Sequence, residues 1–542
     1  MRKQMIAREG MIRSETPEKI WHRYCGFLDL SLREFMEIQE GLLREQIELV
    51  EDSPLGRIIM KGNKPRSVEE FRKVVPLTTY WKDYAPHIGN EPRDDMLAIK
   101  PVVWAHTSGR GGSFKWIPWS QRALERYIDT TMASLILSAA ERKGEVNITD
   151  GDRFLFILAP PPYISGISAW ALADRYTLRM IPPLEIADKL EFQERIELGF
   201  KMALSSGADF VGAVSTALVK VGEAMAGHSQ GIRFSPSLLR PNVFFRLLRA
   251  WLYSKKERRP MLPRDLWPVK GICCGGTDTS IYREQLRHYW GKYPYEMYGC
   301  TEVGVITAQS WAKKDMTFYP YLAFLEFIPE EEWLKTLENP DYQPPTLLAD
   351  ELEPGKIYEV VLTNFYGMPL LRYRIGDLIR VTALEEPETG IKLPQVSFYS
   401  RADGLIDLYG IVRLDEKTLW QAIDNTKVPH EDWSARKEYE GNTPVLRVYL
   451  EPKVRIEAKE LEEMLHQELL EINPLYEEAI GEMETNPIRV TLLEEGSFQR
   501  YYQRRKQEGA DLAHLKPPHM NAKDAAIRDL VGAGEVETPT GR

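Results

Sequence analysis

Residues 153–290 constrain the fold most strongly, because short apolar runs alternate there with helical segments. The runs, which predict strands, lie at 153–159, 178–181, 209–214 and 269–274. Helices are predicted near 189–204, 216–226, 243–255 and 280–290. Such alternation predicts crossover units and a largely parallel sheet covered by helices on both faces. Ligands of such sheets bind at the carboxyl ends of the strands.

The flanking regions differ in pattern. Apolar residues between Phe35 and Leu49 recur every three or four positions, which predicts a long amphipathic helix. Residues 357–381 predict strands joined by short turns, as a meander or small β-barrel. From about 430 to 515 the pattern changes to a small α+β module with strands 445–450 and 488–493 and helices near 456–472 and 497–508.

The predicted fold class is therefore α/β: a large N-terminal domain of parallel sheets flanked by helices, with a small β-barrel, and a smaller, mobile C-terminal α+β domain. We expect the large domain at 1–400, a hinge segment at 401–417, the small domain at 418–520 and a flexible tail at 521–542.

Composition narrows the class of partner. The formal net charge of -10 argues against a nucleic-acid partner. The chain contains no run of eighteen apolar residues, and its first residues lack the apolar segment of a secretory signal. We therefore expect a cytoplasmic protein with a small-molecule partner and without a membrane partner. The oligomeric state is left open.

Cysteine and histidine spacing predicts no structural metal. Four cysteines in 542 residues do not form a disulfide framework, and nine scattered histidines show no zinc-binding spacing. Cys273 and Cys274 are adjacent at the end of a predicted strand, where we expect them to be buried.

A Gly-rich loop, defined here as residues 106–115, follows the apolar run that begins at Val103. Gly109 and two further glycines let backbone N–H groups converge on an anion, and Thr107, Ser108 and Lys115 add hydroxyl groups and a positive charge. The loop lacks the Gly-Lys-Ser/Thr of a Walker A motif. It predicts a phosphate-binding loop, with a surface hairpin or plain turn as the alternative. A helix capped by Ser120 is expected to follow.

Five short motifs occur in a fixed order along the chain. They are the Gly-rich loop, Gly-Gly-Thr at 275–277, Tyr-Gly-Cys-Thr-Glu at 298–302, Tyr-Arg-Ile-Gly-Asp at 373–377 and Ser-Arg-Ala-Asp-Gly at 400–404. In this order they resemble the adenylate-forming superfamily, which includes acyl-CoA ligases, adenylation domains and luciferases. The segments 76–84, 324–329, 371–377, 416–418, 496–499, 508–511 and 515–517 are most similar to the auxin-responsive acyl acid amido synthetases.

The resemblance implies a two-step ligase that uses ATP and Mg²⁺. A carboxylate would attack the α-phosphate of ATP to give an acyl-AMP and pyrophosphate. The amine of an amino acid would then displace AMP to form an amide. An acyl-CoA ligase of the phenylacetate type, with a thiol acceptor, is the first alternative. A non-catalytic nucleotide-binding protein is the second.

The resemblance also implies roles for residues in the motifs. Glu302 would bind Mg²⁺, and Thr301 would contact the α-phosphate. Tyr298 and Gly299 would lie against adenine, with Gly276 and Thr277 along its edge, and Asp377 would accept the ribose hydroxyls. A plain turn at the end of a strand is the structural alternative for 298–302, and a hydrogen-bonded loop aspartate is the alternative for Asp377.

Further roles are implied outside these motifs. Arg401 would reach the nucleotide at the hinge, Lys417 would touch phosphate, and Lys516 would enter the site for one half-reaction, although an exposed Arg or Lys is usually only a solvated charge. The pocket for the acid would include Tyr163, Ile164 and Trp170, with a role in the core as the alternative.

Arg110 departs from the family pattern, which has a hydroxyl residue at that place in the Gly-rich loop. Because the guanidinium group is a planar fork of donors suited to phosphate oxygens, Arg110 is predicted to bind the leaving pyrophosphate. An Arg110→Ala variant with unchanged KM for ATP and unchanged pyrophosphate release would contradict this prediction.

Overall fold

The computed structural model describes residues 15–89, 93–107, 114–190, 192–227, 240–275, 279–280, 282–339, 341–402, 404–408, 412–414, 416–483, 486–507 and 519–532. These residues form two compact units, each of which is described by itself. Unit 1 comprises the described residues up to Ser400, and unit 2 comprises those from Arg401 onward.

Five of the described helices of unit 1 begin at a residue whose side chain caps them. Side chains of Thr16, Ser31, Ser53, Ser67 and Ser120 each accept a hydrogen bond from the first turn of the helix that follows. The capped helix after Ser120 and the long amphipathic helix are thereby confirmed. The helices are α1 Pro17–Cys25, α2 Leu32–Val50, α3 Pro54–Ile59, α4 Val68–Val74, α5 Ala85–Ile88, α6 Gln121–Ala139, α7 Ile164–Arg175, α8 Leu184–Ala187, α9 Phe192–Ser206, α10 Ser215–Gly227, α11 Pro241–Lys256, α12 Pro263–Leu266, α13 Arg283–Trp290 and α14 Glu330–Glu338.

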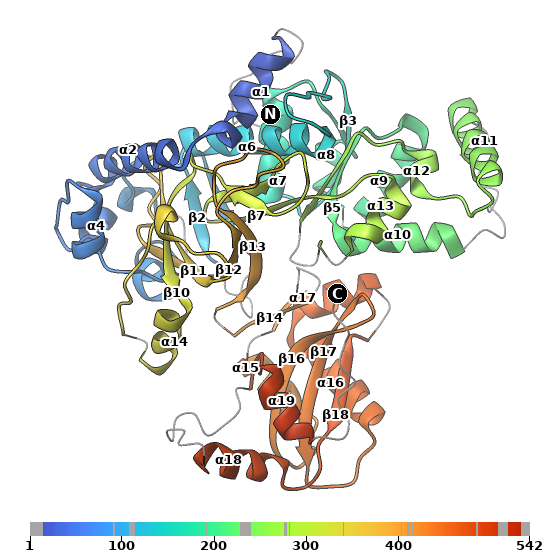
Figure 1. The fold of residues 1–542 in the computed structure, drawn as a ribbon. Coiled ribbons are helices and arrows are strands. Elements are labelled where there is room, and N and C mark those ends of the chain that lie inside the picture. Colours follow the sequence, from blue (N-terminus) through green and yellow to red (C-terminus); the bar gives the residue numbers. More distant parts are fainter. Residues whose placement is uncertain are drawn as a thin grey trace. The chain divides into compact units, whose positions relative to one another are not determined.

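One large sheet organises unit 1 (Figure 1). Its strand order is β10-β11-β12-β13-β9-β8-β7-β6-β5-β3-β4, and β4, β3, β5, β6 and β7 run parallel. A separate hairpin consists of β1 and β2. The strands are β1 Val103–His106, β2 Trp116–Trp119, β3 Arg153–Ile157, β4 Arg179–Ile181, β5 Phe210–Val214, β6 Gly271–Gly275, β7 Tyr295–Cys300, β8 Gly304–Gln309, β9 Met316–Phe318, β10 Ala323–Pro329, β11 Ile357–Asn364, β12 Tyr373–Ala383 and β13 Gln395–Arg401.

Helices cover both faces of the parallel half, as the alternation predicted. Along β3, Phe154 and Phe156 pack in the core that includes α6 and α7. Leu155 and Ile157 point the other way, into a second core that includes residues of α9, α10 and α13. The run 154–157 is apolar at successive positions because neither face of the strand meets water there.

The expected meander is confirmed, because β10, β11 and β12 pair antiparallel in sequence order, but these strands continue the large sheet and do not form a separate barrel. The strands β11 and β12, which were expected to form a meander or barrel, belong to the same sheet as the parallel strands, and β10 ends its open strand order. β7 joins the two halves, since it pairs parallel with β6 and antiparallel with β8. Strand patterns along a sequence indicate local hairpins, but they do not show whether a distant strand extends the sheet.

Unit 2 contains a three-stranded sheet, in which β17 pairs antiparallel with β16 and parallel with β18. Helices α16 and α17 pack on it around Leu461, Leu465 and Tyr476. The predicted strands and helices of this module are confirmed, whereas β16 and α17 were not predicted. The elements are β14 Ile406–Leu408, β15 Val412–Leu414, α15 Glu416–Asn425, β16 His430–Glu440, β17 Thr443–Pro452, α16 Ala458–Ile472, α17 Pro474–Met483, β18 Ile488–Leu492, α18 Ser497–Gln507 and α19 Asp524–Val531.

Part of the expected flexible tail is structured. Helix α19 lies within 521–542, and its Ile527 and Leu530 are buried in a cluster with Phe498 and Tyr501 of α18. The flexible-tail prediction is therefore wrong for residues 521–532. The apolar positions of this helix are few, and the surrounding Gly, Pro and Thr content obscured their helical spacing.

Among the described helices, none combines the length and the apolar character that crossing a membrane requires.

Candidate functional site

Lys115, Glu302 and Tyr373 meet in unit 1. The ammonium Nζ of Lys115 lies 3.1 Å from Oε1 of Glu302 and donates to the phenol oxygen of Tyr373 over 2.7 Å. The Tyr373 hydroxyl in turn donates to the same Oε1 over 3.2 Å. The carboxylate is buried, and the lysine is partly exposed. Two donors converging on one oxygen hold this carboxylate in a single orientation.

Three distant segments bring these side chains together. Lys115 ends the Gly-rich loop and directly precedes β2, Glu302 lies in the turn between β7 and β8, and Tyr373 begins β12. The segment before the loop contributes as well, because the π-helical turn Tyr80–Tyr84 places Tyr80 beside the lysine. Lys115 Nζ lies 5.9 Å from the Tyr80 ring centroid and 5.4 Å from that of Tyr373.

The turn that carries Glu302 depends on two glycines. Gly304 has a φ of 92°, a conformation that other residues rarely adopt. A Cβ atom on Gly299 would lie 2.0 Å from the Gly304 carbonyl oxygen. Side chains from neighbouring elements then fix the backbone: Trp119 Nε1 donates to the Thr301 carbonyl and Asn364 Nδ2 to the Glu302 carbonyl.

A second pair lies on the strands next to this turn. The hydroxyl of Tyr298, on β7, donates to Oδ2 of Asp377, on β12, over 2.7 Å, and both residues are buried. The register of β11 and β12 shifts between Glu359 and Val361, and Gly376 within this irregularity has a φ of 80°. Asp377 lies within this bulge, directly after Gly376, and the bulge changes the direction of its side chain.

Cys300 lies between the two groups. Burial and, after it, the charges of Glu302 and Asp377 raise the pKa of the Cys300 thiol well above its ordinary value. Both carboxylates therefore lie near one thiol. The cluster of Lys115, Glu302 and Tyr373 is thus close to the Tyr298–Asp377 pair. The same environment keeps Cys300 protonated and unreactive as a nucleophile.

The chemistry of Glu302 fits a magnesium ion that arrives with a nucleotide. Mg²⁺ in nucleotide sites is commonly held by one or two carboxylates together with phosphate oxygens and water. A carboxylate has about four acceptor positions, so it can bind a metal ion and accept hydrogen bonds at the same time. The described residues contain no group of three or more His, Cys, Asp or Glu side chains that could hold a metal by themselves.

The Gly-rich loop joins the two strands of the β1–β2 hairpin. Its described ends are tied together, because the Thr107 amide donates to the Lys115 carbonyl over 3.1 Å. A surface hairpin and a phosphate-binding loop are thus compatible predictions, because the segment joins two paired strands and Lys115 lies where the second strand begins. Ser108, Gly109 and Arg110 lie outside the described residues, and their predicted roles stay predictions.

The remaining predicted residues are only partly described. Gly276, Thr277 and Lys516 lie outside the described residues, and Lys417 is described as part of α15 without its side chain. Arg401 ends β13 at the boundary of the two units. Their predicted roles are not tested by the structure.

The residues predicted for the acid pocket are spread along α7. Tyr163 precedes the helix, and its ring lies 4.4 Å from that of His106 at the end of β1. Ile164 packs against the main core. Trp170 lies two turns along the helix, where its Nε1 donates to Asp188 over 2.7 Å. The contact with His106 connects Tyr163 to the start of the Gly-rich loop, whereas Trp170 is tied to α8.

Tyr373, Tyr80 and Asn364 were not predicted to act in the site. Tyr373 stands within the Tyr-Arg-Ile-Gly-Asp motif and Tyr80 within the segment 76–84, so both were inside segments singled out from the sequence. The link between the segments is the backbone pairing of Thr78 with Tyr373. A pairing between residues nearly three hundred positions apart has no local signal in the sequence.

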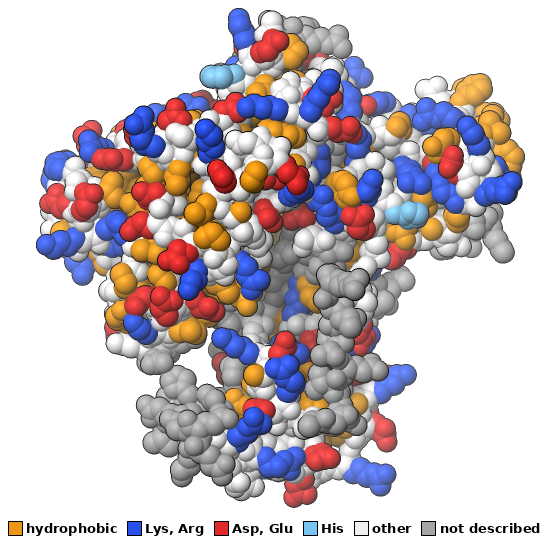
Figure 2. All heavy atoms as spheres, in the orientation of Figure 1, with side chains coloured by type: hydrophobic (Ala, Val, Ile, Leu, Met, Phe, Trp, Pro, Cys, Tyr) orange, Lys and Arg blue, Asp and Glu red, His pale blue; other side chains and the backbone are white. Residues whose placement is uncertain are grey.

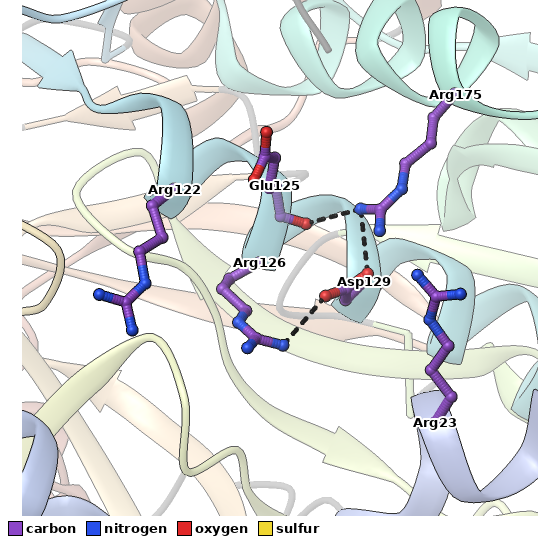
Figure 3. Close-up of a pocket in the computed structure, with 6 residues that line it drawn as sticks. All are labelled: Arg23, Arg122, Glu125, Arg126, Asp129 and Arg175. Atoms are coloured by element: carbon purple, nitrogen blue, oxygen red, sulfur yellow. Dashed lines mark hydrogen bonds and ion pairs between the residues drawn. The ribbon is translucent and has the colours of Figure 1, made fainter. Parts of the chain in front are cut away.

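A cavity of about 400 Å³ on unit 1 is separate from these residues (Figure 3). Its lining comprises Arg23 of α1, Arg122, Glu125, Arg126 and Asp129 of α6, and Arg175 of α7. Arg126 and Arg175 both point to Asp129, at 3.4 and 3.0 Å (Figure 3). Arg23 pairs with Glu15, and Arg122 pairs with Glu45. Each of these arginines has an acidic partner, and the pair of Arg175 with Asp129 joins α7 to α6.

Comparisons with known proteins agree with this architecture. Domain models of the GH3 family match the chain in order: the N-terminal domain at residues 25–163, the central domain at 316–401 and the C-terminal domain at 417–525.

Among curated relatives, a jasmonoyl–L-amino acid synthetase of Oryza sativa subsp. japonica is 32% identical over 176 residues, which are 29% of this chain and 28% of that protein. An indole-3-acetic acid-amido synthetase of Arabidopsis thaliana is 26% identical over 283 residues, 48% of this chain and 46% of that protein. The matched segments thus span less than half of these relatives.

Two solved structures share the fold over most of the chain. An acyl acid amido synthetase in complex with 2,4-DB is 17% identical, with a TM-score of 0.53 over 95% of this chain and 96% of that one. A 2-hydroxyisobutyryl-CoA ligase in complex with 2-HIB-AMP and CoA is 14% identical, with a TM-score of 0.56 over 86% and 87%. Since the three domain models together match more than half of the sequence, the chain belongs to the GH3 family.

Proposed function

We propose that this protein is an ATP-dependent ligase that converts a carboxylic acid into an acyl-AMP and transfers the acyl group to an amino acid. The observation that carries the proposal is the convergence of Lys115 and Tyr373 on the Glu302 carboxylate, next to the Tyr298–Asp377 pair. The names of the relatives, which join acids to amino acids, support the same reaction.

In the first step, an oxygen of the substrate carboxylate bonds to the α-phosphorus of ATP, and the bond to the β-phosphate oxygen breaks. The carboxylate is already anionic near pH 7, so the site needs positive charge rather than a base. Lys115 offers that charge at the base of the Gly-rich loop. Mg²⁺, held by Glu302 and the phosphates, would neutralise the charge that develops on pyrophosphate.

The Tyr298–Asp377 pair is suited to the nucleoside. Asp377 accepts a hydrogen bond from Tyr298 on one oxygen, and a carboxylate keeps acceptor capacity for ribose hydroxyls. The phenol ring would lie against adenine while its hydroxyl holds Asp377 in place. Thr301, in the same turn as Glu302, would then contact the α-phosphate.

In the second step, the amine nitrogen attacks the acyl carbon and AMP leaves. Water would hydrolyse the acyl-AMP if it entered the site, so we propose that unit 2 rotates about residues 401–417 between the steps. Arg401, Lys417 and Lys516 would act in this exchange. A proline at Ala402 is then expected to slow the second step more than the first. Because the reaction consumes ATP, we also propose that the protein is cytoplasmic, as expected from the sequence.

The second candidate function is that of a CoA ligase, in which the acyl group passes to a thiol. It is favoured by the fold that the structure shares with a CoA ligase at a TM-score of 0.56. Both candidates have the same first step. Pyrophosphate release is therefore measured first, with a panel of aromatic and aliphatic acids that includes indole-3-acetic and jasmonic acids. Each active acid is then offered the twenty amino acids or CoA.

Amide formation with an amino acid would support the proposal, and thioester formation alone would replace it with the CoA ligase. If the protein binds ATP but releases pyrophosphate with none of the acids, the non-catalytic nucleotide-binding reading would stand.

A further inference from the structure

Helix α11 exposes a large apolar surface. Phe244, Phe245, Leu248, Trp251, Leu252 and Tyr253 are each between 38% and 66% exposed. Other exposed large apolar side chains in the described parts of the chain are scattered among several elements. Single exposed apolar residues are ordinary, but six on one helix of sixteen residues form a patch that marks an interaction site.

The helix is held in place by its opposite side. Val243, Ala250 and Ser254 are buried, and they recur at helical spacing along one stripe. Arg246 also anchors the helix, because its guanidinium donates to the carbonyls of Ala203 and Leu204 at the end of α9. The exposed aromatic and leucine side chains are therefore not needed to attach α11 to unit 1.

Charge on this helix has one sign. Within α11 the charged residues are Arg246, Arg249, Lys255 and Lys256, and none is acidic. Arg249, Lys255 and Lys256 are exposed. Figure 2 shows blue side chains beside the orange ones over this helix, which lies at the outer edge of unit 1 in Figure 1. A protein with a net charge of -10 thus presents a local surface that is both apolar and basic.

The charge decides between the possible partners. In a symmetric pair of copies, the same basic residues would face one another across the apolar contact, and this repulsion disfavours a second copy. An anionic lipid surface instead complements the lysines, while aromatic side chains are favoured at the boundary between lipid head groups and acyl chains. We propose that the exposed face of α11, defined by Phe244, Phe245, Leu248, Trp251, Leu252 and Tyr253 with Arg249, Lys255 and Lys256, binds an anionic membrane surface.

This binding would be peripheral, so it differs from a membrane span and departs from the expectation, drawn from the sequence, that the protein has no membrane partner. Its consequence is that the protein would associate with membranes reversibly, through lipid charge and a shallow apolar contact. Screening by salt weakens the electrostatic part, since the Debye length falls to about 3 Å at 1 M salt.

The test is co-sedimentation of the full chain with vesicles of phosphatidylcholine alone and with equimolar phosphatidylcholine and phosphatidylglycerol. We expect binding to the anionic vesicles, weaker binding in high salt, and little binding to the neutral ones. The Trp251→Ser/Leu252→Ser variant should lower the apparent affinity at least about tenfold. Lys255→Gln/Lys256→Gln should lower it roughly tenfold or more, because each basic residue near an anionic surface contributes about 1 kcal/mol.

Matched control variants distinguish binding through this face from non-specific binding of the protein to vesicles. Ile58→Ser/Leu384→Ser replaces two side chains that are each 45% exposed elsewhere on unit 1, and Lys73→Gln/Lys100→Gln removes two exposed lysines. Both controls should bind vesicles as the natural chain does. If the Trp251→Ser/Leu252→Ser variant fails to fold, the lysine variant decides the question.

Two results would overturn the proposal. The first is an absence of binding to anionic vesicles, or binding that neither α11 variant weakens. The second is a concentration-dependent dimer in sedimentation velocity that Trp251→Ser/Leu252→Ser abolishes, without vesicle binding, since this would assign the face to a second copy.

Discussion

The Lys115 ammonium group lies 3.1 Å from Oε1 of Glu302, a residue 187 positions further along the chain. The contact ties the end of the Gly-rich loop to the turn between β7 and β8. If both residues serve phosphate transfer, this ion pair holds the lysine in place before the nucleotide arrives. Such preorganisation lets a charged group stabilise the transition state without being reoriented during the reaction.

Replacing Lys115 with Ala should therefore slow acyl-AMP formation by about 10²–10³-fold, the usual effect of losing one preorganised donor. The measurement is pyrophosphate release under single-turnover conditions. Lys82→Ala is the matched control, because Lys82 is an exposed lysine that pairs with Asp341 on the surface. A reduction of less than about threefold for Lys115→Ala would remove the lysine from the proposed mechanism.

Tyr298→Phe keeps the ring and removes the hydroxyl that donates to Asp377. A hydrogen bond to a charged carboxylate contributes about 1.5–3 kcal/mol, so the KM for ATP should rise roughly 10- to 150-fold with a smaller change in kcat. Tyr399→Phe serves as the control, because this tyrosine is 47% exposed. Equal KM values for both variants would separate Tyr298 from nucleotide binding.

Arg372, which directly precedes Tyr373, forms a buried ion pair with Glu326. The guanidinium lies 2.8 Å from the carboxylate and also donates to the carbonyls of Arg72 and Val75, next to the segment that carries Tyr80. Arg372→Met leaves the Glu326 charge buried without this partner, so the free energy of unfolding should fall by about 3–5 kcal/mol.

The control for that change is Arg44→Met, which breaks an exposed pair with Glu40 and should alter stability by less than about 1 kcal/mol. Chemical denaturation of both variants checks the difference. Similar losses for the two would show that the buried pair does not stabilise unit 1.

Glu296 should make stability depend on pH. Burial raises the pKa of Glu296 to about 7, from about 4.5 in an unfolded chain. The protonated carboxyl is thus favoured in the folded state, and stability falls as the pH rises from about 4.5 through about 7. Glu296→Gln should remove this decline and raise the unfolding midpoint at pH 8 relative to the natural chain, while Glu284→Gln, at an exposed position, should not. An unchanged pH profile would contradict the prediction.

His519 should act in the same direction in unit 2. Its two ring nitrogens lie 2.6 Å from Glu416 and 2.8 Å from Asp432. Burial alone would lower its pKa, but the hydrogen bonds to Asp432 and Glu416 outweigh burial and raise it. The stabilisation is complete below the unfolded pKa of about 6.5 and is lost as the pH rises through the raised value.

His519→Gln should abolish that dependence in urea unfolding followed between pH 5 and 9. His466 is the matched control with the opposite sign: burial lowers its pKa, so its contribution is lost as the pH falls. Parallel pH profiles for His519→Gln and the natural chain would contradict the role of the histidine.

The sequence was informative where burial leaves a pattern. The apolar runs at 154–157 and 210–214 are continuous because both faces of those strands are covered. Ser31 and Ser120 each cap the helix that begins directly after them. The motifs also singled out Lys115, Glu302 and Asp377. Their functional roles stay predictions until the variants are measured.

Other features could not be read from sequence. The position of β7 at the junction of the parallel and antiparallel halves depends on pairing between strands far apart in the chain. The contact of Tyr373 with Lys115 depends on the backbone pairing of Thr78 and Tyr373. Burial of Ile527 depends on packing against α18, because the helix itself is short.

The central claim is that the substrate carboxylate attacks the α-phosphate of ATP. It is tested most directly with a carboxylic acid labelled with ¹⁸O in both oxygens, chosen from those that support pyrophosphate release. After amide formation in unlabelled water, the account predicts AMP that carries one ¹⁸O atom from the acid, with pyrophosphate unlabelled. Unlabelled AMP, or formation of ADP and labelled phosphate, would contradict it.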